Sequence, residues 1–468
     1  MNAELAYLFR HALLREAAYQ LQMPGDRERL HALAFAVIEE LAGGRAPEPA
    51  PLGAAGQTPF VPHPTDAFAE ELADHAAIAQ GAAMRGARKL YLRRAAEQVD
   101  RQSGGAASER LWEQHAELVE GVDRGESLRR AAVAGQAAGR LKGAESLFDQ
   151  ALSIFQAAGD RRLEGIALEN LATLYHHTGR MQEAERTFER ALELHGGSGN
   201  RRAVGSARNH LAGLYQDTAR VPQAEGAWEE ALAIFREVGD RRSEGIALGN
   251  LANLYLETGR LPQSGEFYGQ ALAILREIGD RRSVAIFLGN LAGFHLNSGD
   301  SDQAERYYAQ ALALHRECGH RLGEGIVLDN LAVLFQKSGR FEEAELQYGQ
   351  AIAIASEINA PAAEGAATGN LASLYHLVGR LEDSDLTFQK ALAIHRRLGN
   401  RRYEAVVLCD YARLLLAKRK IEEARGLWLE GAAILRELGD TQELEYKAPA
   451  LRDACAGAGV PSFDGSPA

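Results

Sequence analysis

Amide side chains recur through this chain of 468 residues at a constant spacing, and they are its best candidates for contacting another molecule. An asparagine occupies one position of a 40-residue unit at Asn170, Asn250, Asn290, Asn330 and Asn370. Two other units carry His210 and Asp410 there. An amide donates and accepts hydrogen bonds and carries no charge to desolvate, which suits contact with a peptide backbone. The alternative is that these amides join neighbouring helices, and the sequence leaves both roles open.

Further polar side chains accompany this row. Asn253 follows Asn250 by three residues, and one position six residues beyond the row holds His176, Gln216, Gln336 and His376. Leucine replaces them in other units, so the surface is mixed in character. Such a surface favours a helical or extended peptide that carries both apolar and polar groups.

Catalytic chemistry has little support in the sequence. It contains no phosphate-binding GxxxxGK[ST] loop, and the nucleophile-elbow, zinc-protease and dinucleotide-binding motifs are also absent. His176 and His177 are adjacent and therefore point to different faces of a helix. The three cysteines show no zinc-binding spacing. We therefore expect no catalytic residue, no metal site and no cofactor.

The charge balance restricts the class of partner. The chain has 64 acidic and 52 basic residues and a formal net charge of -12, which disfavours nucleic acids and anionic membranes. Arginine pairs begin at 161, 201, 241, 281 and 401. They could form a stripe that binds phosphate or acidic segments. Four of the five pairs also have acidic neighbours, such as Glu244, and local ion pairing is the favoured interpretation.

The elements that must position these residues follow from the repeat itself. In the unit 241–280, Asp240 is suited to cap a first helix, because its carboxylate can accept from the first free amides. Gly259 marks the end of that helix, and Pro262 fits the first turn of a second helix. Each unit is therefore predicted to form two helices, which must stack on neighbouring pairs to bury their apolar faces.

The order Leu-Ala…Tyr…Gly…Ala…Tyr…Ala within a unit resembles the tetratricopeptide repeat, in the 40-residue form of kinesin light chains and Pins-type scaffold proteins. The resemblance covers 161–440, with a weaker unit at 121–160. It implies an all-α, right-handed solenoid whose first helices line a concave face, with the asparagines contacting a bound peptide. No basic residue stands one turn before the asparagines, so the carboxylate-clamp subtype is not expected.

The flanking segments differ from the repeats. Residues 67–80, 82–102 and 106–120 read as three further helices. The expected organisation is an N-terminal helical segment at 1–41, a Pro/Gly-rich linker at 42–66, degenerate helical repeats at 67–120, the solenoid at 121–440, a capping helix at 441–456 and a disordered tail at 457–468.

The N-terminus resembles the end of the winged-helix segment that joins a bacterial switch ATPase of the STAND type to its repeats. The matching residues are Phe9, Arg10, His11, Ala12, Leu13, Ala18, Tyr19, Arg29, Leu30 and His31. A two-helix cap on the solenoid is the alternative. The main functional expectation is a scaffold that binds a protein or peptide partner in its groove. The second is a sensing arm of a bacterial signalling ATPase, kinase or transcription regulator.

The sequence also bears on the location and the assembly of the protein. The N-terminus has no apolar segment of signal-peptide type, and no run of about 18 apolar residues could span a membrane. The sparse cysteines fit a reducing compartment. We expect a cytoplasmic protein, and an uncapped solenoid end could self-associate.

Overall fold

The 40-residue period of the sequence becomes a period of two antiparallel helices in the computed structural model, which describes residues 23–54, 60–79, 81–101 and 105–464. These ranges contain twenty-one α-helices, one short 3-10 helix and no strand. The chain divides into two compact units. The first comprises residues 1–137 and 142–163, and the second comprises residues 138–141 and 164–468.

The first unit contains the helices before the regular repeats. Its elements are α2 (Pro24–Leu41), η1 (Pro64–Phe68), α3 (Ala69–Ala79), α4 (Ala82–Arg101), α5 (Ala106–Ala116), α6 (Gly121–Ala137) and α7 (Leu141–Ala158). Helices α3, α4 and α5 occupy the three stretches expected to be helical. A buried ion pair fastens η1 to α4, with Arg94 Nε 2.6 Å from Asp66 Oδ1.

The N-terminal resemblance falls mostly outside the described residues, which begin at 23. Arg29, Leu30 and His31 lie in α2, where His31 Nδ1 is 2.6 Å from His75 Nδ1 of α3. Between α2 and η1 the described residues form no helix. The backbone N–H of Leu52 in this linker donates to Asp123 Oδ1 over 2.9 Å, which ties the linker to α6.

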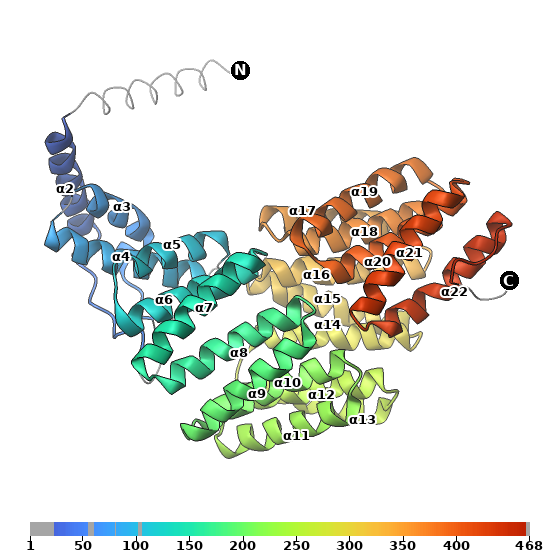
Figure 1. Ribbon diagram of the computed structural model, residues 1–468, viewed down its shortest axis with the longest axis horizontal. Helices are drawn as coiled ribbons and strands as arrows, with labels where there is room; N and C mark the ends of the chain where they lie inside the picture. Colours follow the sequence, from blue (N-terminus) through green and yellow to red (C-terminus); the bar gives the residue numbers. More distant parts are fainter. Residues whose placement is uncertain (1–22, 55–59, 80, 102–104, 465–468) are drawn as a thin grey trace. The chain divides into compact units, whose positions relative to one another are not determined.

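The second unit is a regular stack of helix pairs (Figure 1). Its helices are α8 (Arg161–His177), α9 (Met181–Gly197), α10 (Arg201–Asp217), α11 (Val221–Glu237), α12 (Arg241–Glu257), α13 (Leu261–Glu277), α14 (Arg281–Asn297), α15 (Ser301–Glu317), α16 (Arg321–Lys337), α17 (Phe341–Glu357), α18 (Pro361–Leu377), α19 (Leu381–Leu398), α20 (Arg401–Ala417), α21 (Ile421–Glu437) and α22 (Thr441–Ala458). Even-numbered helices from α8 to α20 are the first helices of their pairs, and odd-numbered helices are the second.

The helix boundaries arise from the capping residues that the sequence indicated. Asp240 Oδ1 accepts from the backbone N–H of Ser243 over 3.1 Å and so satisfies one free amide of α12. Gly259 has φ 73° and reverses the chain after α12, a conformation that costs glycine little. Pro262 lies in the first turn of α13, where its missing N–H breaks no helical bond.

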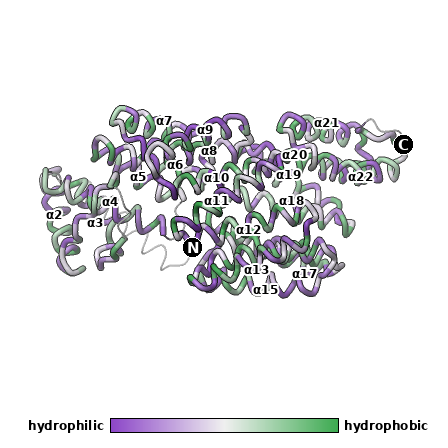
Figure 2. The backbone as a smooth tube through the Cα atoms, turned by 90° about the horizontal axis from the view of Figure 1, so that it is seen from below, coloured by the Kyte–Doolittle hydropathy of each residue, from purple (hydrophilic) through white to green (hydrophobic). Residues whose placement is uncertain are grey.

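The core lies between the helices of each pair and between successive pairs. In the second unit, seven buried aromatic residues recur every 40 residues: Phe188, Trp228, Tyr268, Tyr308, Tyr348, Phe388 and Trp428. Ala252 and Ala271 are fully buried where helices meet. At one alanine position Ser264 stands instead, and its hydroxyl donates to the Ala252 carbonyl over 2.8 Å. Figure 2 shows apolar and polar residues alternating along the helices, as expected for helices with one buried face.

The C-terminal end corrects one expectation. Helix α22 packs beside α20 and α21 and reaches Ala458, so it is two residues longer than predicted. Phe463 is buried against the last helices, and Arg425 lies over its ring. The segment predicted to be disordered from 457 is therefore ordered as far as Asp464, because Phe463 buries apolar surface that the sequence analysis did not credit.

Membrane insertion finds no support in the helices. Within the described residues, none combines the length and the apolar character needed to cross a bilayer.

Candidate functional site

One side of the second unit is built by the first helices. Each of α10, α12, α14, α16 and α18 contacts the next first helix directly as well as its own partner. We call this side, formed by α8, α10, α12, α14, α16, α18 and α20, the inner face. It carries the asparagine row, so the question is what those amides contact.

Several row residues bond to the preceding first helix. Asn250 Nδ2 donates to Asn209 Oδ1 over 3.2 Å. Asn370 Nδ2 lies 3.2 and 3.0 Å from the two carboxylate oxygens of Asp329. His210 Nδ1 lies 2.9 Å from Glu169 Oε1. We call these three pairs the inner-face ladder. In these three pairs the row residues join neighbouring first helices, which is the alternative role considered for them in the sequence.

The ladder is interrupted where glycine occupies the acceptor position. Gly249 precedes Asn290 by 41 residues and offers no side chain, and Asn290 Nδ2 donates instead to Asn253 Oδ1 over 3.3 Å. Gly289 stands in the same relation to Asn330. Within the described part of the chain, the Asn330 side chain has no hydrogen-bond partner. Asn170 is not free.

The position six residues beyond the row forms a second set of cross-links. His176 Nε2 is 2.7 Å from Asp217 Oδ2, and Gln216 Nε2 donates to Glu257 Oε2 over 2.6 Å. Gln336 Oε1 accepts from the buried Tyr348 hydroxyl over 3.1 Å. These three side chains therefore bond to other residues of the protein, and each of them is half-buried.

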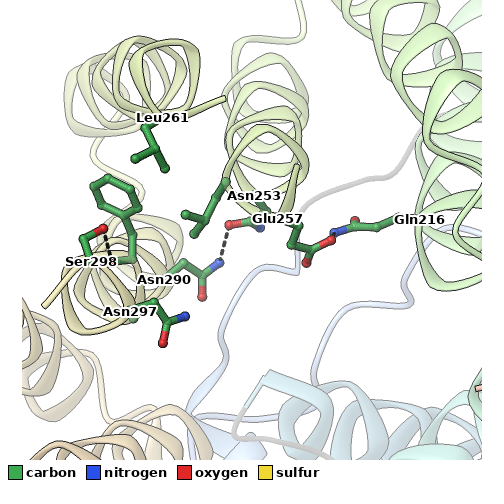
Figure 3. Close-up of a pocket in the computed structure, with 10 residues that line it drawn as sticks. Gln216, Asn253, Glu257, Leu261, Asn290, Asn297 and Ser298 are labelled. Atoms are coloured by element: carbon green, nitrogen blue, oxygen red, sulfur yellow. Dashed lines mark hydrogen bonds between the residues drawn. The ribbon is translucent and has the colours of Figure 1, made fainter. Parts of the chain in front are cut away.

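Three of the sequence-predicted residues come together in one pocket of about 810 Å³ (Figure 3). Gln216, Asn253 and Asn290 line it, from three successive first helices. The remaining lining residues are Leu256, Glu257, Leu261, Gly293, Phe294, Asn297 and Ser298. Figure 3 shows the Asn290–Asn253 bond and, on another part of the wall, the Gln216 side chain pointing to its partner Glu257. The other predicted residues lie outside this pocket, and His376 lines a separate one.

Acidic groups dominate the charge near the pocket. Burial raises the pKa of Glu257 above its usual range, the nearby Asp217 carboxylate adds to the rise, and the Gln216 bond opposes it. Glu169 behaves differently. Burial alone would raise its pKa, but contacts with His195, His210 and Ser206 outweigh burial and lower the pKa to about 2. Glu169 is thus a charged anchor within the ladder.

The arginine pairs are engaged locally. Arg241 Nη1 lies 2.6 Å from Glu244 Oε2, and its Nη2 lies 3.1 Å from Glu277. Arg242 Nε lies 2.7 Å from Asp280, the residue that caps the next first helix. Several other pairs repeat this arrangement, and Arg282 instead meets His320 at 3.0 Å. The local ion pairs expected from the sequence are therefore present at Arg241 and Arg401, where Glu244 and Glu404 are the partners.

Sequence reasoning missed the acceptors of the ladder. Glu169, Asn209 and Asp329 each precede a row residue by one position, and the regular repeat hid them because glycine or cysteine stands there in other units. A polar residue at a position that other units fill with glycine was the available signal. In the described residues no group of three His, Cys, Asp or Glu side chains is arranged to hold a metal ion.

Comparisons with known proteins agree with this architecture. Tetratricopeptide repeat models match residues 123–195, 204–277, 283–357 and 367–402, more than half of the chain. No curated protein gives a significant match.

Three solved structures show different degrees of similarity to this chain, and the first of them shares the fold. A Rap protein complexed with competence and sporulation factor is 12% identical with a TM-score of 0.53, over 80% of this chain and 99% of that chain. A putative kinesin light chain of Podospora anserina is 20% identical with a TM-score of 0.34, over 41% and 94%. A STAND protein of Pyrococcus horikoshii with a tetratricopeptide repeat sensor is 14% identical with a TM-score of 0.44, over 84% and 73%.

Proposed function

Because the chain belongs to the tetratricopeptide repeat family, we propose that it is an interaction scaffold that holds a segment of a protein partner against its inner face. The observation that carries this proposal is the pocket of about 810 Å³ formed by α10, α12, α13 and α14. It has the size of a ligand-binding cleft, and its amides stand beside apolar side chains. Binding, without chemistry, is the proposed activity.

The pocket residues are of three chemical types, and each type would make a different contact with the partner segment. Asn253, Asn290 and Asn297 would hydrogen-bond the backbone of the partner segment, because amides supply both donors and acceptors. Leu256 and Phe294 would bury an apolar side chain of the partner. Glu257, near Asp217, would attract a basic group, since both carry negative charge when ionised.

The remaining sequence-predicted residues receive a supporting role in this proposal. His210, Asn250 and Asn370 bond across the ladder and would fix the spacing of the first helices. Residues that are held in this way present a preformed surface, which lowers the entropic cost of binding. We further propose that the chain is not an enzyme, needs no cofactor and acts in the cytoplasm.

A matched pair of leucine variants tests the proposal. The full chain serves as bait in lysate of the source cells, and a captured partner is purified and titrated against three proteins: the unaltered chain, Leu256→Lys in the pocket, and Leu386→Lys. Leu386 is 71% exposed on the second helix α19 and serves as control. We expect Leu256→Lys to weaken binding at least about tenfold, because it places a cation in an apolar contact, and the control to bind normally. Loss in the control alone would place the binding surface on the second helices and refute the proposal.

A second function is favoured by one observation in the first unit. Helix α2, from the segment that resembles a switch-ATPase regulator, exposes Leu30, Leu33, Val37 and Leu41 at helical spacing. Such a stripe suits attachment to another domain or chain, as a sensing arm requires. Capture of an ATPase that is lost in Leu33→Lys but kept in Leu256→Lys would favour this second function over the first.

A further inference from the structure

A second pocket, of about 390 Å³, lies near the C-terminal end of the inner face. It is formed by α18, α20, the turn after α20, and α22. Helix α22 packs more against α20 than against α21, whereas each of α14, α16, α18 and α20 packs more against the preceding second helix than against the preceding first helix. His376, six residues beyond Asn370 of the asparagine row, lines this pocket and places it on the inner face.

Arg413 in this pocket is an arginine with unused hydrogen-bond donors. Its Nε is buried and has no hydrogen-bond partner. Its Nη1 lies 3.6 Å from Asp410 Oδ1, which is too far for a hydrogen bond. Asp410 is itself held by Lys447, whose Nζ lies 2.7 Å from the other carboxylate oxygen. Guanidinium groups elsewhere in the second unit form close pairs with carboxylates, as Arg380 does with Glu345 at 2.9 Å.

The Arg413 side chain is 35% exposed, although its Nε is buried. Four alanines and a glycine make up half of the lining residues, and Leu416 is the one larger aliphatic side chain among them. His376 and Arg419 add two further nitrogen-bearing groups, and Arg419 also donates to the Ala458 carbonyl over 2.7 Å. Asp453 is the single acidic residue of the lining. The pocket walls therefore carry a net positive charge.

We propose that this pocket binds a carboxylate group of the partner segment, with Arg413 as its principal donor and His376 as the second. The guanidinium presents a planar fork of N–H groups that matches the two oxygens of a carboxylate. The inference rests on the proposed function. The first pocket carries acidic groups and the second carries basic groups. A partner segment with a basic part and an acidic part would therefore bind along the inner face in a single orientation. Its basic part would face Glu257, and its acidic part would face Arg413.

The test uses small probes and the full chain labelled with nitrogen-15. N-acetyl-alanine offers a chain-end carboxylate, N-acetyl-glutamic acid α-amide offers a side-chain carboxylate, and N-acetyl-alanine amide offers neither. Inorganic phosphate is the fourth probe, and chloride keeps the ionic strength constant. The readout is the Nε–H resonance of Arg413, assigned by its disappearance in Arg413→Lys. We expect a saturable shift with one or both carboxylates and none with the amide, and the stronger carboxylate identifies its source.

Calorimetry on variants gives the second readout. Arg413→Gln should weaken carboxylate binding about tenfold or more, because it removes a charged donor, and Arg397→Gln at the end of α19 should leave it unchanged. No saturable shift with either carboxylate, or saturation by phosphate alone, would overturn the proposal. If neither carboxylate probe binds while Leu256→Lys still weakens binding of the partner, the carboxylate site is refuted and the proposed function stands. If the carboxylate probes bind while Leu256→Lys binds the partner normally, the first pocket is refuted as the partner's binding site.

Discussion

Asn370 donates to both carboxylate oxygens of Asp329, and this pair is the charged counterpart of the neutral pair in which Asn250 donates to Asn209. Both pairs join one first helix to the next, and the residues stand at equivalent positions of the 40-residue unit. They differ in the cost of burial. Burial raises the pKa of Asp329 to about 6, and the Asn370 bond offsets only part of that rise. The Asn250–Asn209 bond between neutral amides is therefore independent of pH. The Asn370–Asp329 pair instead carries the cost of a buried charge once Asp329 is ionised.

Asp329→Asn should stabilise the protein at pH 8 and have little effect near pH 3.5. The native state holds a proton on Asp329 up to about pH 6, whereas the unfolded chain loses it near its usual value of 3.8. Stability therefore falls as pH rises through that window, because the native state binds more protons. The variant removes this loss, worth up to about 3 kcal/mol at pH 8. Urea midpoints at the two pH values measure it, and equal shifts at both would contradict the assigned burial.

His210→Ala should make the protein more sensitive to acid. The lowered pKa of Glu169 gives stability that is fully present above about 4.5 and is lost as pH falls toward 2. Without His210 the pKa of Glu169 rises, and about 1 kcal/mol is lost at neutral pH. Acid titrations followed by circular dichroism provide the measurement. Asn250→Ala is the control, since its bond to Asn209 is uncharged and its loss should not depend on pH; a similar acid shift in both variants would count against the Glu169 anchor.

The sequence allowed the fold to be predicted almost completely, because each level of the repeat agreed with the others. Asp240, Gly259 and Pro262 each mark the start or the end of a helix by their own chemistry. Because the unit repeats every 40 residues, the same helix boundaries could be predicted along the chain. The site could be predicted only in part. Whether Asn250 faces a ligand or Asn209 depends on the distance between helices 41 residues apart, and no spacing within one helix reports that distance.

Ala252→Leu should destabilise the protein far more than Asn250→Ala. Ala252 is fully buried at a helix contact, where added methylenes force neighbouring side chains apart at a cost of about 1–3 kcal/mol or more. Asn250→Ala removes one hydrogen bond, worth about 1 kcal/mol. Chemical denaturation of the two variants gives the comparison, and equal midpoints would show that the helix contact tolerates a larger side chain.

Two glycines in helices should respond to alanine in opposite ways. A Cβ on Gly245 of α12 would stand 2.8 Å from the Leu275 side chain, so Gly245→Ala should lose about 1–3 kcal/mol. A Cβ on Gly265 of α13 would meet nothing within 4 Å. Gly265→Ala should therefore gain up to about 1 kcal/mol, because alanine favours the helix. Thermal melts test the pair, and stabilisation of both would mean that α12 and α13 pack less closely than described.

Gly289→Asn should complete the ladder and weaken partner binding. Asn330 lacks the acceptor that Asn209 provides for Asn250, because Gly289 stands at the acceptor position. A Cβ at Gly289 would meet only the Val327 side chain, at 3.7 Å, so an asparagine can enter without a clash. Its amide could then accept from Asn330, which should add about 0.5–1.5 kcal/mol of stability, and asparagine also suits a helix slightly better than glycine.

The same substitution should reduce affinity for a partner on the inner face. Gly289 lies one residue before Asn290, a pocket residue, and an open glycine allows a peptide backbone to approach closely. An asparagine there would fill that space and occupy the Asn330 amide. We expect a higher melting temperature together with partner binding weakened about tenfold. Gly265→Ala, which raises stability on a second helix, is the matched control. If Gly289→Asn melts higher but binds as before, the partner does not reach Asn330, and the interrupted ladder is a feature of folding alone.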